Sequence, residues 1–238
     1  MKKEFKIFID FDGTITTTDV GEAIFRQFGK IEKVNIVIGN LLNDKISAKD
    51  CWIELCNSVE SISKKALDNF IDQMEIDSSF PGFVSFCREK EIDHYILSDG
   101  FDYYLERILT RKNLDDVKYF ANTLSVLNDK LIPFFPYLDL GFSSSANCKR
   151  NHIINYSGDE DYTVFIGDGN SDKYTVQYCD FIFAKGDLLK FCERERISYF
   201  PFNNFDDIKQ TMSKLLSKKR LKKRHQAELK RREAYMQE

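Results

Sequence analysis

The sequence lacks the long apolar run that a membrane-spanning helix needs. None of its hydrophobic runs reaches the ~18 residues required. The amino-terminal stretch MKKEFKIFIDFDG has too short an apolar segment for a signal peptide, and it leads directly into acids. Hydrophobic residues make up 42% and charged residues 31% of the 238-residue chain, which is enough for a folded core. We therefore expect a cytoplasmic globular protein without membrane contact, built as one large domain or as a domain with a smaller insertion.

The chain also lacks a C-x-x-C pair. Its six cysteines are scattered, and neither His94 nor His152 has a cysteine or carboxylate at a spacing typical of a metal site. This pattern favours reduced structural thiols over a zinc site. No internal repeat and no low-complexity linker precedes the carboxyl-terminal tail.

The charge is uneven along the chain. From residue 214 onward there are ten Lys/Arg and three Glu, which give +7 and leave −10 for the rest of a chain whose net charge is −3. An acidic body argues against a nucleic-acid-binding protein. The basic tail, residues 213–238, favours a solvated helix with a sparse apolar stripe of Leu215, Leu221 and Leu229; docking of a partner is the alternative. We expect deletion of residues 214–238 to leave turnover nearly unchanged.

Strand patterns alternate with helix patterns along most of the chain. Residues 19–77 are mostly helical in pattern and follow the first strand as an insertion. Later strands are predicted near residues 92–98, 117–127, 162–167, 180–184 and 197–202, with a hairpin turn at Asn128-Asp129 and with helices between the others, one of them starting near residue 173. The alternation predicts an α/β fold, a Rossmann-like doubly wound parallel sheet with helices on both faces.

Polar clusters end three of the predicted strands. Asp10 and Asp12 follow the first, Ser98 ends the second, and Asp168 and Asp172 follow the strand YTVFIG. In a parallel sheet, ligands bind beyond the carboxyl ends of the strands, so these clusters would meet at one edge. Carboxylates packed this closely repel one another, and a hard cation such as Mg²⁺ relieves that repulsion while leaving room for water and phosphate.

Such a pocket can transfer a phosphoryl group. One aspartate can attack phosphorus and form an aspartyl-phosphate, and a second can protonate the leaving oxygen and later activate water. Ser98 offers a hydroxyl at a turn whose backbone N–H groups can hold phosphate oxygens. A lysine is still needed to offset the phosphoryl charge. Lys149 at a helix start is the best-placed candidate, and Arg150 is its rival.

These stretches together resemble the four motifs of the haloacid dehalogenase superfamily of phosphatases. The motifs are DFDGT after a strand, a serine ending a second strand, a lysine at a helix start, and GDGNSD after a later strand. The resemblance implies Asp10 as nucleophile, Asp12 as acid and base, and Lys149 as a catalytic phosphate contact. It implies a magnesium site made by Asp10, the backbone carbonyl of Asp12, and Asp168, with Asp172 nearby.

The chain is also similar to two groups within that superfamily. Residues 18–80 resemble the small helical cap of the phosphoserine phosphatase-like group, which leaves residues 1–17 and 81–212 as the Rossmann-like core. DFDGTITTTD, the Cys148-Lys149 pair and the ending from DFIFAKGD onward resemble the 2-hydroxy-3-keto-5-methylthiopentenyl-1-phosphate phosphatases of methionine salvage. Three stretches depart from the second group's pattern: Ser98-Asp99-Gly100 in the second motif, SSSAN before Cys148, and the segment of about residues 128–145, which is shorter.

The remaining candidate residues concern the substrate. Ser98, Asp99 and Gly100 form a candidate phosphate-binding turn, in which the side chain of Asp99 faces either the pocket or solvent. Asp19 either caps the first helix of the insertion or touches the leaving group of the substrate.

The leading hypothesis is a magnesium-dependent phosphatase of methionine salvage that acts on a small phosphomonoester. A phosphoserine, phosphocholine or phosphoethanolamine phosphatase is the second hypothesis, and a non-catalytic phosphometabolite-binding module is the third. A small cap that shuts over the site argues against protein or nucleic-acid substrates. We expect a monomer or a homodimer.

Overall fold

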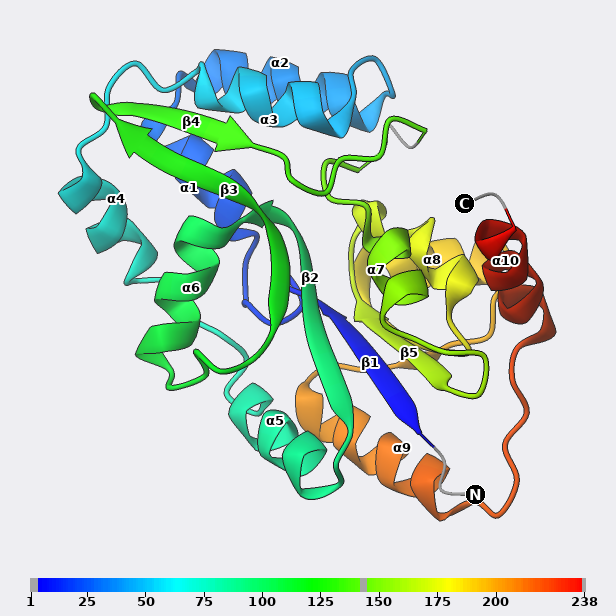
Figure 1. Cartoon of the computed structure of the whole chain (residues 1–238). Coiled ribbons are helices and arrows are strands. Elements are labelled where there is room, and N and C mark those ends of the chain that lie inside the picture. The colour runs from blue at the N-terminus through cyan, green and yellow to red at the C-terminus, as the bar shows by residue number, and fades with distance from the viewer. Residues whose placement is uncertain (1–3, 142–144, 237–238) are drawn as a thin grey trace. The chain divides into compact units, whose positions relative to one another are not determined.

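The computed structural model describes residues 4–141 and 145–236, which divide into two compact units. Of these, unit 1 holds residues 4–15, 76–97 and 149–236, and unit 2 holds residues 16–75, 98–141 and 145–148. The elements of unit 1 are β1 (Phe5–Asp10), α5 (Phe80–Glu89), α7 (Lys149–Asn155), β5 (Tyr162–Gly167), η1 (Asn170–Asp172), η2 (Thr175–Tyr178), β6 (Phe181–Ala184), α8 (Gly186–Arg194), β7 (Phe200–Pro201), α9 (Phe205–Ser217) and α10 (His225–Tyr235) (Figure 1). The elements of unit 2 are α1 (Val20–Phe28), α2 (Ile31–Leu42), α3 (Ala48–Cys56), α4 (Lys64–Ile71), α6 (Asp102–Arg111), β3 (Tyr119–Leu127) and β4 (Lys130–Phe134). Strand β2 (Asp93–Phe101) begins in unit 1 and ends in unit 2.

The strands of the described residues form a seven-stranded sheet in the order β4-β3-β2-β1-β5-β6-β7. Strand β1 pairs in parallel with β2 on one side and with β5 on the other, and β5, β6 and β7 continue in parallel. The chain leaves β1 toward β2 and returns to its other side at β5, so the strand order reverses at β1. In an open α/β sheet a crevice at the carboxyl ends of the strands forms at such a reversal. The predicted α/β fold with a largely parallel sheet is confirmed.

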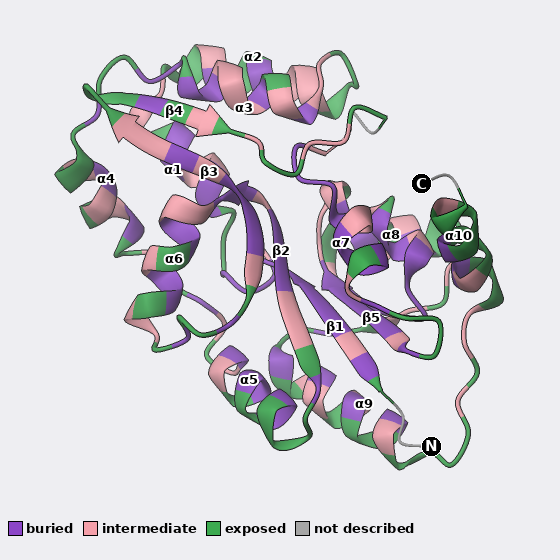
Figure 2. Cartoon of the chain, in the orientation of Figure 1, coloured by how far each residue is buried: buried purple, intermediate pink, exposed green. Residues whose placement is uncertain are grey.

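The central strands are buried on both faces, which explains their continuous apolar sequences. Figure 2 shows β1 and β5 mostly buried, and only one residue of each strand is half-buried. Ile7, Phe8 and Ile9 are fully buried, as are Val164 and Phe165. A strand covered on one face would alternate apolar and polar residues, so a run such as KIFID indicates a sheet with layers on both sides.

Two helices of unit 1 pack against each other through aromatic rings. Phe205 at the start of α9 lies 4.8 Å from Phe80 and 5.3 Å from Phe83 of α5, measured between ring centroids. Asn204 caps α9 by accepting the N–H groups of Asp206 and Asp207, which fixes where the helix begins. Figure 1 shows the two helices side by side.

The carboxyl-terminal helix α10 is not the solvated helix that the charge pattern predicts. Arg231 is only 3% exposed and donates to the hydroxyl of Thr163 on β5 at 2.9 Å and to Asp180 at 3.2 Å. The hydroxyl of Tyr235 donates to the carbonyl of Ile154, the next-to-last residue of α7, at 2.8 Å. Of the predicted leucine stripe, Leu215 on α9 is buried at 3% exposed, whereas Leu229 on α10 is 44% exposed, so the stripe does not continue onto α10. A buried arginine and a tyrosine hydroxyl attach this helix, and hydrophobic periodicity does not predict such polar contacts.

Unit 2 consists of short capped helices and a hairpin. Asp19, Ser47 and Ser63 each accept a backbone N–H at the start of a helix, so the helix starts follow from single polar side chains. Strands β3 and β4 pair antiparallel, and Asn128 and Asp129 between them have φ of 49° and 58°. These two residue types tolerate left-handed backbone in a tight hairpin turn, so the predicted hairpin is confirmed.

Two predicted elements differ from the structure. The sequence predicts an α-helix over residues 173–179, yet residues 175–178 form a 3₁₀ turn, because β-branched and aromatic side chains crowd an α-helical turn there. The last strand is predicted over residues 197–202 but spans only Phe200–Pro201, because a proline cannot donate to a strand ladder. The predicted core, cap and tail, with their boundaries, stay a prediction.

Within the described part of the chain, no helix is both long and apolar enough to cross a membrane. All six cysteines lie in that part, and all are buried thiols. Burial raises the pKa of Cys87 and of Cys56 to about 12, which makes these two thiols poor nucleophiles.

Candidate active site

The candidate site of unit 1 lies where β1 and β5 end side by side. Ile9 and Ile166 are register partners, Asp10 is the last residue of β1, and Asp168 directly follows β5. After β1 the chain turns sharply through Gly13, which has φ of +76°. A Cβ atom on Gly13 would lie 2.6 Å from a carboxylate oxygen of Asp168. Glycine is therefore required here both for its backbone conformation and for the close approach.

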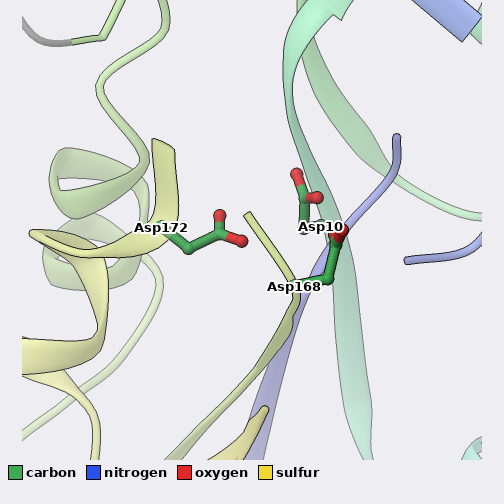
Figure 3. A group of neighbouring side chains, drawn as sticks. All are labelled: Asp10, Asp168 and Asp172. Carbon is green, nitrogen blue, oxygen red and sulfur yellow. The ribbon is translucent and has the colours of Figure 1, made fainter. Parts of the chain in front are cut away.

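Three carboxylates meet at this edge. One oxygen each of Asp10, Asp168 and Asp172 can be chosen so that all lie within 4.8 Å of one another. Figure 3 shows that the three side chains come from different segments and point toward a shared space. Asp10 is 5% exposed and Asp172 is fully buried, so water screens the repulsion between them poorly.

Lys149 supplies the positive charge in this cluster. Its ammonium group donates to Oδ1 of Asp172 at 2.7 Å and also to Oδ1 of Asp10. The side chain of Lys149 is 1% exposed, which is rare for a lysine and requires such partners. The rival candidate, Arg150, donates instead to Asn151 at 2.8 Å.

The pKa shifts follow from burial and from the ratio of three acids to one base. Burial raises the pKa of Asp10 well above its ordinary value, and the charges of Asp172 and Asp168 raise it further against the opposing effect of Lys149. Burial and Asp172 also raise the pKa of Asp168, against a hydrogen bond from Thr14. Burial opposes the charged form of Lys149, but Asp10 and Asp172 outweigh burial and raise its pKa. The cluster thus favours the charged form of the lysine and disfavours ionisation of Asp10 and Asp168.

Neighbouring groups fix the orientation of two of the acids. The hydroxyl of Thr14 donates to Oδ1 of Asp168 at 2.6 Å. The N–H of Gly169 donates to Oδ2 of Asp172 at 3.2 Å. A Cβ atom on Gly167 would lie 2.4 Å from that same oxygen of Asp172, so glycine is needed in the GDG stretch for space.

The residues present fit a hard divalent cation. All the side-chain donors are carboxylate oxygens, the ligands that Mg²⁺ prefers over nitrogen or sulfur. Three acids gathered around one lysine supply the attraction for such a cation. Asp172 already accepts hydrogen bonds from Lys149 and Gly169, so Asp10 and Asp168 are better placed to hold the ion directly.

The structure brings together part of the predicted site within unit 1. Asp12 is half-buried in the turn that follows β1, two residues after Asp10. Four predicted residues belong to unit 2: Asp19, Ser98, Asp99 and Gly100. Asp19 is exposed and accepts the N–H of Glu22 at 2.7 Å, as expected for a helix cap. Ser98 is buried, and its hydroxyl accepts the N–H of Gly100 at 3.0 Å.

Sequence reasoning missed two residues that organise these segments. Thr14 lies inside DFDGT, yet only its structure shows that it holds Asp168. Asn147 is fully buried and donates to the carbonyls of Ser98 and Phe120. A polar residue two positions before the lysine of the third motif was the available signal for Asn147.

The comparisons with known proteins agree with this geometry. The sequence profile of the haloacid dehalogenase-like hydrolases matches residues 7–176. A protein of Schizosaccharomyces pombe named Pdp3-interacting factor 1 is 30% identical over 238 residues, covering 90% of this chain and 97% of that protein. The 2-hydroxy-3-keto-5-methylthiopentenyl-1-phosphate phosphatase of Bacillus cereus (strain AH820) is 27% identical over 217 residues, covering 90% of this chain and 98% of that protein. A solved structure of a phospho-aspartyl intermediate analogue of phosphoserine phosphatase superposes with a TM-score of 0.69 at 20% identity, covering 90% of this chain and 99% of that one.

The chain therefore belongs to the haloacid dehalogenase-like hydrolase family. It is an enzyme of the hydrolase class, and phosphatases are among its relatives. The resemblance stated from the motifs is confirmed at the level of the family and the fold.

Proposed function

We propose that this protein is a magnesium-dependent phosphatase that hydrolyses a small phosphomonoester through an aspartyl-phosphate intermediate. The observation that carries the proposal is the position of Asp10. Its carboxylate stands at the carboxyl end of the central strand, bonded to the buried ammonium of Lys149 and beside Asp168. A carboxylate in this position can attack phosphorus.

In the first proposed step, an oxygen of Asp10 forms a bond to phosphorus while the bond from phosphorus to the leaving oxygen breaks. Asp12 gives its proton to the leaving oxygen, which departs as an alcohol or enol. Asp12 then takes a proton from water, whose oxygen attacks phosphorus. The bond from phosphorus to Asp10 breaks, and inorganic phosphate and the original carboxylate result.

Lys149 has two roles in this proposal. It holds Oδ1 of Asp10, which leaves the other oxygen for attack, and its charge offsets the phosphoryl oxygens. Asp172 holds Lys149 from the other side. Asp10, Asp168 and the backbone carbonyl of Asp12 would hold Mg²⁺, with Asp172 beside it. When bound, the ion neutralises phosphoryl charge that the carboxylates alone would repel.

The proposed substrate is 2-hydroxy-3-keto-5-methylthiopentenyl-1-phosphate, as the name of the Bacillus cereus relative suggests. Phosphoserine is the second candidate, since structures of phosphoserine phosphatase share the fold. Phosphocholine and phosphoethanolamine are further alternatives. Ser98 and the turn through Asp99 and Gly100 would bind the phosphate. Asp19 would either touch the leaving group or serve only as the helix cap seen in the structure.

We further propose a cytoplasmic monomer or homodimer whose partner is the small substrate rather than nucleic acid or membrane. The six buried cysteines suit a reducing compartment. A non-catalytic phosphometabolite-binding module is the less favoured function, because the acids that the reaction needs are all in the sequence.

The test is phosphate release from a panel of phosphomonoesters, with Mg²⁺ and with a chelator. The panel contains the methylthiopentenyl enol phosphate, phosphoserine, phosphocholine and phosphoethanolamine. We expect magnesium-dependent release that Asp10→Asn lowers by at least about 10³-fold, as for loss of a nucleophile. Asp187→Asn is the matched control, because that aspartate pairs with Lys190 on the surface. Equal activity of Asp10→Asn and wild type would refute the mechanism, and no release from any ester would favour the binding module.

Thermal unfolding tests the metal site without reference to turnover. At a free Mg²⁺ concentration of about 100 times its dissociation constant, binding adds about 2.7 kcal/mol of stability. In a protein of this size we expect the melting temperature to rise by about 5–10 °C. Asp168→Asn should remove most of this rise, whereas Asp187→Asn should keep it. An unchanged rise in Asp168→Asn would contradict the proposed ion site.

A further inference from the structure

A second lysine of unit 1 lies near the acidic cluster, and the proposed mechanism does not use it. Lys185 directly follows β6 and is the last residue before α8, which begins at Gly186. Its backbone N–H donates to the carbonyl of Gly167 at 3.2 Å, so the residue stands beside the end of β5, where Asp168 follows. Lys185 is half-buried. We therefore ask what its charge does to the neighbouring acids.

The turn into α8 fits closely against the backbone of Asp168. The N–H of Leu188 donates to the carbonyl of Asp168 at 2.8 Å. Gly186 has φ of +55°, and a Cβ atom on it would lie 2.9 Å from that same carbonyl oxygen. Glycine is therefore needed in this turn for its backbone conformation and for the close approach. These contacts fix the point from which the side chain of Lys185 extends relative to Asp168.

The ammonium group of Lys185 contacts the segment that orients Asp168. It donates to the carbonyl of Thr14 at 3.5 Å, and the hydroxyl of Thr14 donates to Oδ1 of Asp168 at 2.6 Å. It also lies 5.2 Å from the ring centroid of Phe202, which is within the range of a cation–π contact. Within residues 4–141 and 145–236 this ammonium forms no ion pair. Its charge therefore acts on the acids from beyond contact distance.

The charge of Lys185 reaches Asp168 through space. Burial raises the pKa of Asp168, whereas the hydrogen bond from Thr14 and the charge of Lys185 lower it. Lys149 also lowers this pKa, but by less than Lys185 does. Charges near buried groups are screened less than charges in bulk water. A cation held at Asp168 would therefore be repelled by the same ammonium.

We infer that Lys185 sets how tightly the acidic cluster holds its divalent cation, because its ammonium weakens the binding of Mg²⁺ at Asp10 and Asp168. The inference rests on the proposed function, in which these two carboxylates hold the ion. The ammonium lowers the negative potential that attracts the ion. It occupies no carboxylate oxygen, because it donates to a backbone carbonyl.

The experiment measures the Mg²⁺ dissociation constant of the full-length protein by thermal unfolding over a series of Mg²⁺ concentrations. Each variant is compared with its own metal-free melting temperature. Lys185→Met and Lys185→Gln remove the charge, and Lys185→Arg keeps it. We expect the two uncharged variants to bind Mg²⁺ about 3–10-fold more tightly at low ionic strength, and this difference to shrink to less than about 2-fold in about 0.5 M KCl. Lys185→Arg should stay within about 2-fold of wild type.

Lys190→Met is the matched control, because it makes the same charge change on the same helix. Lys190 is exposed and pairs with Asp187 at 2.8 Å on the surface, so its Mg²⁺ dissociation constant should stay within about 2-fold of wild type. The direction of the change separates an electrostatic role from a structural one. If Lys185 only held the turn at Thr14, Lys185→Met would loosen the site and weaken Mg²⁺ binding. Weaker or unchanged binding in Lys185→Met, or equal tightening in Lys190→Met, would overturn the inference.

Phosphate release separates this inference from the proposed function. In Lys185→Met the Mg²⁺ concentration for half-maximal release should fall by about the same 3–10-fold, while kcat at saturating Mg²⁺ changes less than about 3-fold. If wild type releases phosphate and binds Mg²⁺ but Lys185→Met binds it with wild-type affinity, the inference alone fails. If wild type neither binds Mg²⁺ nor releases phosphate from any ester, the proposed function fails and the inference fails with it.

Discussion

Replacement of Lys149 by methionine tests the charge balance of the site most directly. The side chain of Lys149 is 1% exposed, and its two partners, Asp10 and Asp172, are 7% and 0% exposed. Methionine fills nearly the same space without the charge. The change therefore leaves two buried carboxylates, already next to Asp168, without their shared cation.

The expected loss of stability follows from this burial. Removing one partner of a buried ion pair costs about 3–5 kcal/mol, because the remaining charge has no compensation. In a chain of this size that corresponds to a fall in melting temperature of about 6–20 °C in metal-free buffer. Loss of an electrostatic contact to the reacting group should lower kcat by about 10²–10³-fold as well.

Chemical denaturation measures the first effect and phosphate release the second. Arg150→Met is the matched control, since it makes the same charge change one residue further along α7, where the guanidinium donates to Asn151. We expect this control to lose less than about 1 kcal/mol and to keep kcat within about 3-fold. If Lys149→Met unfolded at the same denaturant concentration as wild type, the buried pairs with Asp10 and Asp172 would not form as described. If Arg150→Met lost the activity and Lys149→Met kept it, the catalytic role proposed for Lys149 would belong to Arg150.

Two further changes test unit 1 away from the acids. Burial lowers the pKa of His152 on α7 from 6.5 to about 4, so folding requires its neutral form and this contribution is lost as pH falls from the unfolded value toward the folded one. We expect about 2 kcal/mol of stability to disappear between pH 7 and pH 5, and His152→Gln to flatten that part of the stability profile; an equally steep profile in the variant would refute the assignment. Arg231→Ala should cost about 3 kcal/mol, because it leaves the buried Asp180 without its guanidinium, whereas Arg232→Ala, on the exposed side of α10, should cost less than about 0.5 kcal/mol. Equal unfolding midpoints of these two arginine variants would mean that Arg231 does not attach α10. The tail would then be the solvated helix predicted from the sequence, and deletion of residues 214–238 should leave turnover nearly unchanged.

The sheet could be predicted from the sequence because its signals are local and repeated. Runs such as KIFID and YTVFIG are apolar without alternation, and each precedes an acid-rich turn. Residues 173–179 could not be predicted in the same way, because packing decides whether a short polar and aromatic stretch becomes an α-helix or a 3₁₀ turn. The packing of α10 was missed for a related reason, since it depends on polar side chains such as Arg231, which reaches Thr163 and Asp180 far away in sequence.

The candidate site shows the same limit at the level of side chains. Asp10, Asp168 and Lys149 lie together because of the order of the strands and the position of α7. The spacing of the motifs along the sequence predicts both. The hydrogen bond from Thr14 to Asp168 and the hydrogen bonds to Asp99 depend on which rotamers fit after folding. Residue type alone allowed the side chain of Asp99 to face either a pocket or solvent, and only the three hydrogen bonds that its Oδ1 accepts from the chain before α7 show that it organises that segment.

The repulsion between the acids of the cluster and the chemistry proposed for them both follow from the same arrangement of carboxylates. Burial at this sheet edge, together with the charges of Asp172 and Asp168, raises the pKa of Asp10, so its ionised form destabilises the folded protein. Lys149 offsets part of that repulsion, but one ammonium cannot balance three carboxylates. In the proposed reaction, a cation would bring the missing positive charge and a phosphate ester would bring the group to be attacked. The cluster is therefore least stable when empty, and binding of the proposed ligands relieves the repulsion that the fold creates.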